Sequence, residues 1–259
     1  MKKIENTHFL FGLNCFSRGK VELLRQLTTH LLDRGPGKPS LLTIFTPNPE
    51  QVVQAHHDPH FASVLGSADI LLPDGIGLVL ATRLGAWLGK GRALSERISG
   101  TDVVTALLKD DRVRRDAEVL VIGGRNLSDY VSKLRARGWR LTWSEAYQDA
   151  QQPTIDEERA VRQLFKQLRP KMVFVALGAP AQEKWVNSHL KLLAESEVRL
   201  AMVVGGAFDM LSGQVSRAPS IVQKLNLEWL YRLVTQPWRW RRQLRLLEFI
   251  PLTVTELFK

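Results

Sequence analysis

The feature of this sequence that most constrains its fold is a repeated alternation of short apolar runs with longer amphipathic ones. Seven runs have the length and composition of buried strands, and they cover residues 9–13, 41–45, 70–72, 119–122, 140–144, 173–176 and 201–204. Seven stretches have helical periodicity, near residues 20–32, 49–56, 77–88, 101–108, 128–137, 155–168 and 181–193. This rhythm is typical of an α/β domain in which helices cover both faces of a mostly parallel sheet.

Two of the helix starts carry N-cap signals. Asn48 precedes Pro49, and Thr154 precedes a first turn that is rich in acidic residues. Oxygen-bearing side chains satisfy the free amides of a first helical turn, and proline or acidic residues suit the positions that follow. We therefore expect helices to begin directly after residues 48 and 154.

The last part of the chain has a different pattern. Beyond Pro219 the periodicity is purely helical, and Pro237 separates two basic amphipathic segments. We therefore divide the chain into an α/β domain at residues 1–213, which would carry the chemistry, and a helical appendage at residues 214–259.

The positive charge of the chain is concentrated in this appendage. The net charge is +10, and from Gln214 onward eight Lys and Arg residues stand against three Glu, which is half of the excess. Aromatic residues alternate with the arginines there, namely Trp229, Tyr231, Trp238 and Trp240. Apolar rings that enter a lipid headgroup layer beside cations that meet phosphate are typical of an interfacial helix. We expect the appendage to associate with an anionic membrane surface.

Other features of the sequence indicate where in the cell the protein is located. No run of about 18 apolar residues is present that could span a bilayer, and the first residues lack the apolar stretch of a signal peptide. The single cysteine, Cys15, excludes an internal disulfide, fits a reducing cytosol, and is expected to be a buried thiol rather than a nucleophile. We expect a cytoplasmic protein that is peripheral on the inner face of the cell membrane.

Polar residues follow three of the expected strands. The motifs are Thr46-Pro-Asn48, Asp74-Gly-Ile-Gly77 and Pro180-Ala-Gln182-Glu183. Ligands of an open α/β sheet bind at the carboxyl ends of its strands. Each motif alone is equally explained by a turn or a cap. Three motifs at one edge indicate a site in which a carboxylate acts as general base on a sugar hydroxyl while helix N-termini hold phosphate.

The sequence predicts neither a cofactor nor a metal ion. Gly75 and Gly77 have Leu80 where a dinucleotide fingerprint requires a third glycine, which disfavours a nicotinamide or flavin enzyme. The histidines at residues 56–60 flank Pro59, which breaks the helix on which they would share a face, so a solvated helix end is favoured over a metal site. No Asp-x-Asp pair, which could bind a divalent ion on the diphosphate of a nucleotide sugar, follows a strand. If the substrate is a nucleotide sugar, arginines and backbone amides would therefore stabilise the charge of the leaving diphosphate.

A set of ordered motifs gives the chain a family resemblance. They are Thr46-Pro-Asn48, Asp74-Gly-Ile-Gly77, Arg97-Ile-Ser-Gly-Thr-Asp102, Pro180-Ala-Gln182-Glu183, Gly205-Gly-Ala-Phe-Asp209 with Ser212-Gly213, Arg217-Ala-Pro219 and Glu228-Trp-Leu-Tyr-Arg232. Over nearly the whole chain they resemble the WecG/TagA/CpsF glycosyltransferases (glycosyltransferase family 26), bacterial enzymes of teichoic acid, enterobacterial common antigen and exopolysaccharide synthesis. Asn226 stands where that family commonly has glycine, and a helix cap would explain the exchange.

The resemblance implies a Rossmann-like sheet of the GT-E type and a metal-independent, inverting transfer of a sugar. The donor would be a UDP-sugar, of the N-acetylmannosamine type or a related hexose, and the acceptor an undecaprenyl-diphosphate-linked sugar. Asp74 would be the general base on the acceptor hydroxyl. Residues from both parts of the chain would bind substrate, namely Thr46, Asn48, Arg97, Gln182, Arg232, Arg239 and Arg242.

Two other interpretations explain part of the sequence. A nucleic-acid-binding protein would use the basic, tryptophan-rich tail to stack bases, but it leaves the three strand-end motifs unused. A non-catalytic UDP-sugar-binding protein would bind donor without turnover. We favour the transferase, without nucleic acid as a partner, and we expect its exposed apolar tail to allow homo-oligomers away from the membrane.

Overall fold

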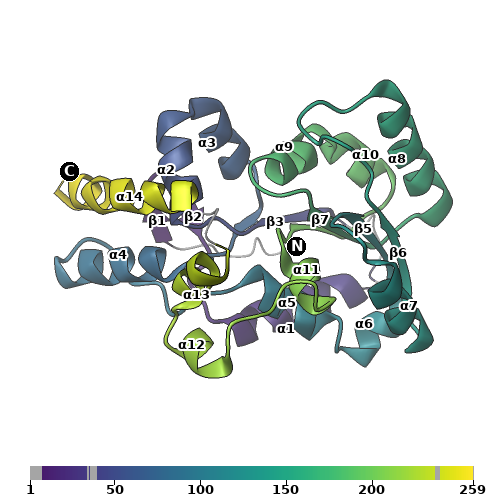
Figure 1. The fold of residues 1–259 in the computed structure, drawn as a ribbon, viewed down its shortest axis with the longest axis horizontal. Helices are drawn as coiled ribbons and strands as arrows, with labels where there is room; N and C mark the ends of the chain where they lie inside the picture. The colour runs from purple at the N-terminus through teal and green to yellow at the C-terminus, as the bar shows by residue number, and fades with distance from the viewer. Residues whose placement is uncertain (1–7, 34, 36–39, 237–239, 259) are drawn as a thin grey trace.

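A computed structural model describes residues 8–33, 35, 40–236 and 240–258 of the chain (Figure 1). Within these residues the sheet consists of β1 (His8–Leu10), β2 (Leu13–Cys15), β3 (Leu42–Phe45), β4 (Ile70–Leu71), β5 (Glu118–Gly123), β6 (Arg140–Ser144), β7 (Met172–Ala176) and β8 (Leu200–Val203). Their order is β1-β2-β4-β3-β8-β7-β5-β6, and β1 alone runs antiparallel to its neighbour among these strands. The predicted α/β class with a mostly parallel sheet is confirmed.

Helices lie on both sides of this sheet (Figure 1). The first along the chain are α1 (Lys20–Leu32), α2 (Pro49–His57), α3 (Pro59–Gly66), α4 (Ile76–Trp87), α5 (Gly100–Leu107), α6 (Asp111–Asp116) and α7 (Ser128–Ala136). They are followed by α8 (Ile155–Leu168), α9 (Ala181–Ser188), α10 (Leu190–Glu195), α11 (Ala207–Leu211), α12 (Ser220–Lys224), α13 (Glu228–Thr235) and α14 (Trp240–Phe258).

Alternate residues of the central strands belong to two core clusters, one on each side of the sheet. In β5, Val119 and Val121 pack in the cluster that includes residues of α1, α5 and α7, whereas Leu120 and Ile122 pack in the cluster that includes residues of α2, α8 and α9. Because both faces are covered, the strands are apolar throughout instead of alternating with polar residues.

Both N-caps predicted from the sequence are confirmed. The Asn48 Oδ1 accepts the amide hydrogen of Gln51 at 3.0 Å, and the Thr154 Oγ1 accepts that of Glu157 at 3.3 Å. The Gln51 and Glu157 side chains bond back to the cap amides, so each helix begins with a capping box. The start of α2 is thereby fixed immediately after β3.

Asn226 also lies at a helix end, as the sequence suggested. Its φ is 59°, and the amides of Asn226 and Leu227 donate to the carbonyls of Gln223 and Val222 at the end of α12. This is a Schellman arrangement, which favours glycine at the left-handed position and accepts asparagine.

The prediction of one strand over residues 9–13 is wrong. The chain turns at Phe11 and Gly12, whose φ angles are 53° and 74°, so β1 and β2 form a hairpin. Two positive φ angles are the geometry of a tight two-residue hairpin turn, and the apolar character of the sequence continues through it. Cys15 at the end of β2 is a buried free thiol, as predicted, and burial raises its pKa to about 12.

The helix α14 packs onto the α/β domain. Phe249 is 7% exposed and belongs to the same core cluster as α2 and α4 residues, and Leu257 is 3% exposed. Small residues of α4 allow this contact, since a Cβ added to Gly77 would come 3.3 Å from Phe249 Cε1 and one added to Gly85 would come 2.9 Å from Leu257 Cδ2. Figure 1 shows α4 and α14 extending in the same direction. The division at residue 213 stays a prediction, and the second segment is docked through this helix.

We predict that Phe249→Ala destabilises the protein by about 3 kcal/mol or more, because it removes a buried ring that α14 places in the core. Chemical denaturation of the full chain measures the change. The neighbouring Ile250 is 62% exposed, so Ile250→Ala should shift the free energy of unfolding by no more than about 0.5 kcal/mol. Equal effects of the two variants would show that α14 is not part of the cooperative fold.

Candidate functional site

The predicted site residues gather at one edge of the sheet. Because β4, β3, β8 and β7 are consecutive neighbours and parallel, the segments that follow them lie side by side. Thr46 and Asn48 follow β3, Asp74 follows β4, and Gln182 follows β7 at the start of α9. Parallel topology therefore brings together residues that are far apart in the sequence.

Asp74 is held where the starts of α2 and α4 meet. Its amide donates to the Pro47 carbonyl at 3.0 Å. A Cβ added to Gly75 would come 2.6 Å from Pro49 Cδ, and one added to Gly77 would come 2.9 Å from Pro49 Cγ. The two glycines are thus required for the close approach of α4 to Pro49, and this approach places Asp74 beside Asn48.

The carboxylate of Asp74 lies among donors and charges of both signs. It accepts a hydrogen bond from the Gly100 amide at the start of α5, and Arg97 Nη1 lies 4.0 Å from its Oδ1. Loss of hydration raises the pKa of Asp74, while Arg97 and Arg232 lower it and Glu228 raises it; the net direction is upward. About a third of the side chain is exposed, at 33%. A reachable carboxylate with a raised pKa has the properties of a general base.

A chain of ion pairs joins α13 to the site, and the sequence did not reveal it. Glu228, the first residue of α13, is 8% exposed and lies 2.5 Å from Arg97 Nη2 and 3.5 Å from Arg217 Nε. Arg217 in turn pairs with Asp102 of α5 at 2.5 Å. Each of these residues belongs to a quoted motif, but only the fold shows that the motifs contact one another.

The polar residues at the ends of β3 and β7 are buried or form hydrogen bonds within the protein. Thr46 is 8% exposed, and its side chain lies 3.3 Å from where a Cβ of Gly100 would be. The buried Gln182 donates to Glu183 Oε1 at 2.9 Å and accepts from the Gly205 amide at 3.0 Å, which ties α9 to the end of β8. Asn48 caps α2 through its carbonyl oxygen.

Glu183 is the last residue of the Pro180-Ala-Gln182-Glu183 motif, and the sequence predicted no role for it. It is completely buried, its Oε1 accepts from Gln51 and Gln182, and its Oε2 has no hydrogen-bond partner among the described atoms. Burial raises the pKa of this carboxyl group. Glu183 fixes the side chains of α2 and α9 relative to each other beneath the site.

Of the three arginines that the sequence predicts in the appendage, Arg232 has a described side chain. Arg232 lies close enough to Asp74 to lower its pKa, and its Nη2 is 3.0 Å from Met210 Sδ. The structure therefore brings Arg232 to the predicted site. Arg239 lies outside the described residues, and Arg242 is in α14 with a side chain outside the described set.

Exposed apolar residues lie on α4, α13 and α14. On α4 they lie on one helical face, and Trp87 is 81% exposed. We use the term apolar face for the exposed residues Leu80, Leu84, Trp87, Trp229, Leu230, Val234, Trp240, Leu244, Leu247, Ile250, Val254 and Phe258 of α4, α13 and α14. Lys90 Nζ lies 5.9 Å from the centroid of the Phe258 ring, and Arg83 and Arg92, on and after α4, are also exposed. An apolar face with a basic rim fits an anionic lipid surface.

In the described part of the chain, no three His, Cys, Asp or Glu side chains form a group that could hold a metal ion. No described helix is both long enough and apolar enough to cross a bilayer. Metal independence itself stays a prediction.

Comparison with known proteins gives two kinds of match. Residues 10–259 match the model of the glycosyl transferase WecG/TagA/CpsF family. The chain is similar to the N-acetylglucosaminyldiphosphoundecaprenol N-acetyl-beta-D-mannosaminyltransferase of Bacillus spizizenii, at 36% identity over 90% of this chain and 83% of the relative. It is also similar to the protein of the same description from Bacillus subtilis, at 34% identity over 84% of this chain and 79% of the relative.

We predict that Asp74→Asn makes the folded protein more stable at neutral pH. The raised pKa means that folding disfavours the charged form, so stability falls as pH rises from the usual aspartate pKa through the raised one, and the loss is complete above it. The variant lacks this loss, and the two proteins should converge at low pH. Thermal unfolding over a pH series tests the prediction.

Asp110→Asn is the control for this experiment. The hydrogen bond from Arg112 lowers the pKa of Asp110, so its ionised form stabilises the fold and neutralisation should lower the melting temperature above the usual aspartate pKa. A loss of stability at neutral pH in Asp74→Asn would contradict the assignment.

Proposed function

The chain belongs to the WecG/TagA/CpsF family of glycosyl transferases, and on this basis we propose that it transfers a hexose from a UDP-sugar to a sugar on undecaprenyl diphosphate, with inversion at the transferred carbon. The names of its relatives favour N-acetylmannosamine as the transferred sugar and N-acetylglucosaminyl diphosphoundecaprenol as the acceptor. The products would serve surface polysaccharide or teichoic acid synthesis.

The environment of Asp74 is the observation that carries this proposal. In the proposed reaction the carboxylate of Asp74 takes the proton of an acceptor hydroxyl, and the hydroxyl oxygen forms a bond to the anomeric carbon as its bond to the UDP oxygen breaks. The UDP leaves with the electron pair of that bond. The raised pKa of Asp74 makes it a stronger base, and Arg97 and Arg232 nearby can meet the developing diphosphate charge.

The other predicted residues are assigned to substrate positioning. Thr46 and Asn48 lie on the loop that contacts Asp74. Gln182 accepts a hydrogen bond from the Gly205 amide, which holds the start of α9 against the end of β8. Arg239 and Arg242 are proposed to close over the donor when the appendage meets the membrane. The reaction as proposed uses no metal ion, so the arginines and the amides at helix starts stabilise the leaving group.

The apolar face is proposed to rest on the inner face of the cell membrane, where a polyprenyl-linked acceptor resides. Asp74 lies two residues before α4, and Trp87 is the last residue of this helix, so α4 connects the base to the proposed docking surface. The proposed membrane contact thus includes α4 as well as the appendage. Burial of a large apolar side chain contributes about 1.5–3 kcal/mol, and the basic rim adds attraction to anionic lipids.

We predict that Asp74→Asn lowers kcat by about 10²–10⁴-fold, the usual contribution of a general base. The assay measures UDP release from a panel of UDP-sugars with a short-chain polyprenyl-diphosphate sugar acceptor. The wild-type rate should fall on the acid side at a pH above the ordinary aspartate range, because protonation follows the raised pKa.

Asp129→Asn, at an exposed position in the first turn of α7, should keep full activity. Cooperative thermal unfolding of the Asp74 variant shows that it is folded. Near wild-type turnover by a folded Asp74→Asn protein would refute the base assignment, and donor binding by the wild type without turnover would favour a UDP-sugar-binding protein.

We predict that replacing Leu84 and Trp87 together by serine weakens binding to phosphatidylglycerol vesicles by about tenfold or more, since each tenfold corresponds to about 1.4 kcal/mol. Vesicle sedimentation measures the change. Ile155 on α8 is 77% exposed and outside the apolar face, so Ile155→Ser is the matched control and should bind normally. Equal binding by the double variant would exclude α4 from the membrane contact.

A further inference from the structure

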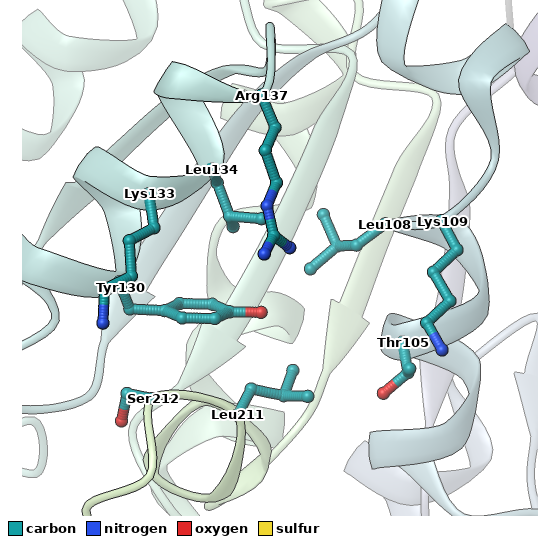
Figure 2. Close-up of a pocket in the computed structure, with 9 residues that line it drawn as sticks. All are labelled: Thr105, Leu108, Lys109, Tyr130, Lys133, Leu134, Arg137, Leu211 and Ser212. Carbon is teal, nitrogen blue, oxygen red and sulfur yellow. The ribbon is translucent and has the colours of Figure 1, made fainter.

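A cavity lies between α5, α7 and α11, with a volume of about 350 Å³ (Figure 2). Tyr130 comes from α7, and Arg137, Lys109 and Ser212 directly follow or lie just beyond α7, α5 and α11. None of these residues belongs to the motifs around Asp74 except Ser212. The cavity meets the far end of α5, an eight-residue helix of about 12 Å whose first amide bonds Asp74.

The side chains around this cavity are basic. Figure 2 shows the Arg137 guanidinium and the Tyr130 hydroxyl pointing into the same central space, with the Lys109 amine near the Thr105 hydroxyl on the opposite wall. Lys133 also lines the cavity, with its amine drawn at the backbone end of Tyr130. The described residues that line the cavity include no carboxylate. Asp110, next to Lys109 in the chain, pairs with Arg112 at 2.8 Å instead.

The positive charge exceeds what the helix ends require. Lys109 and Arg137 lie at the C-terminal ends of α5 and α7, and each end carries about half a negative charge. Three full cations therefore leave an excess of positive charge in the cavity. Burial raises the pKa of Tyr130, so its hydroxyl stays a neutral hydrogen-bond donor at physiological pH.

Leucines line the cavity from more than one side. Leu134 and Leu211 come from α7 and α11, and Leu108 directly follows α5. A bare ion would leave these side chains without contact, whereas an organic body attached to an anionic group would cover them. The guanidinium of Arg137 presents the planar fork that matches phosphate oxygens.

We propose that this cavity binds a small phosphate-bearing organic molecule, such as a nucleotide, at a site separate from the one that contains Asp74. The phosphate contacts Arg137, Lys109 and the Tyr130 hydroxyl, and the body of the ligand lies on the leucines. Binding here does not depend on the proposed transferase reaction.

Lysine reactivity tests the site locally. The full-length protein is treated with a lysine-methylating reagent in the presence of pyrophosphate, UDP or uridine, and mass spectrometry gives the rate at each lysine. UDP should slow modification of Lys109 and Lys133, pyrophosphate should do so at higher concentration, and uridine should not. Lys166 on α8, exposed and away from the cavity, reports nonspecific protection.

Arg137→Gln should raise the UDP concentration needed for this protection by about tenfold or more, because a hydrogen bond to a charged group is lost. Lys166→Gln, with the same change in net charge, should leave it unaltered. Protection by uridine equal to that by UDP, no protection by any probe, or unchanged protection in Arg137→Gln would each overturn the proposal. None of these outcomes depends on turnover, so a failure here is distinct from a failure of the Asp74 assignment.

Discussion

Gly77 connects the candidate reaction site to the C-terminal helix, because it is closely packed on two sides. A Cβ on Gly77 would come 2.9 Å from Pro49 Cγ on one side and 3.3 Å from Phe249 Cε1 on the other. The first contact brings the start of α4, and with it Asp74, beside the capped start of α2. The second seats α14 against the same helix start. A larger side chain at residue 77 would push these three elements apart, so the position of the carboxylate and the docking of α14 depend on a single packing constraint.

The electrostatics of Asp74 depend on how its cations are shared. Arg97 lies 2.5 Å from Glu228 but 4.0 Å from Asp74, so Glu228 takes the closer pairing. A carboxylate paired directly with an arginine would have a lowered pKa and would be a weaker base. Glu228 therefore has two effects. Its ion pair with Arg97 holds α13 against the α/β domain, and it keeps Arg97 near Asp74 without a direct ion pair that would neutralise the Asp74 carboxylate. The net upward direction of the Asp74 pKa follows from this division, because desolvation then outweighs the attraction.

What could be predicted from the sequence follows from how local each signal is. The strands that are buried on both faces, and the caps at Asn48 and Thr154, depend on neighbouring residues and were correctly located. The hairpin at Phe11 was missed because apolar residues continue through the turn, and the helix expected over residues 181–193 is divided at His189. The contact of Arg97 with Glu228 joins distant motifs, and no local pattern encodes it. Its prediction requires the sheet order and the path of the chain after β8, both of which are tertiary.

Helix α4 connects the base to the apolar face, because Asp74 lies two residues before its start and Leu80, Leu84 and Trp87 are exposed along it. A polyprenyl-linked acceptor has its lipid in the bilayer and its sugar hydroxyl beyond the diphosphate, so the base must lie at a fixed height above the lipid surface. The twelve residues of α4 span about 18 Å, from Ile76, two residues after Asp74, to Trp87. Because α14 packs along α4 at Gly77 and Gly85, the two helices keep this separation as one unit. Under the proposed function, the side of α4 that rests on the membrane fixes the distance between the lipid surface and Asp74, while α13 and Glu228 set the charge that the leaving diphosphate meets.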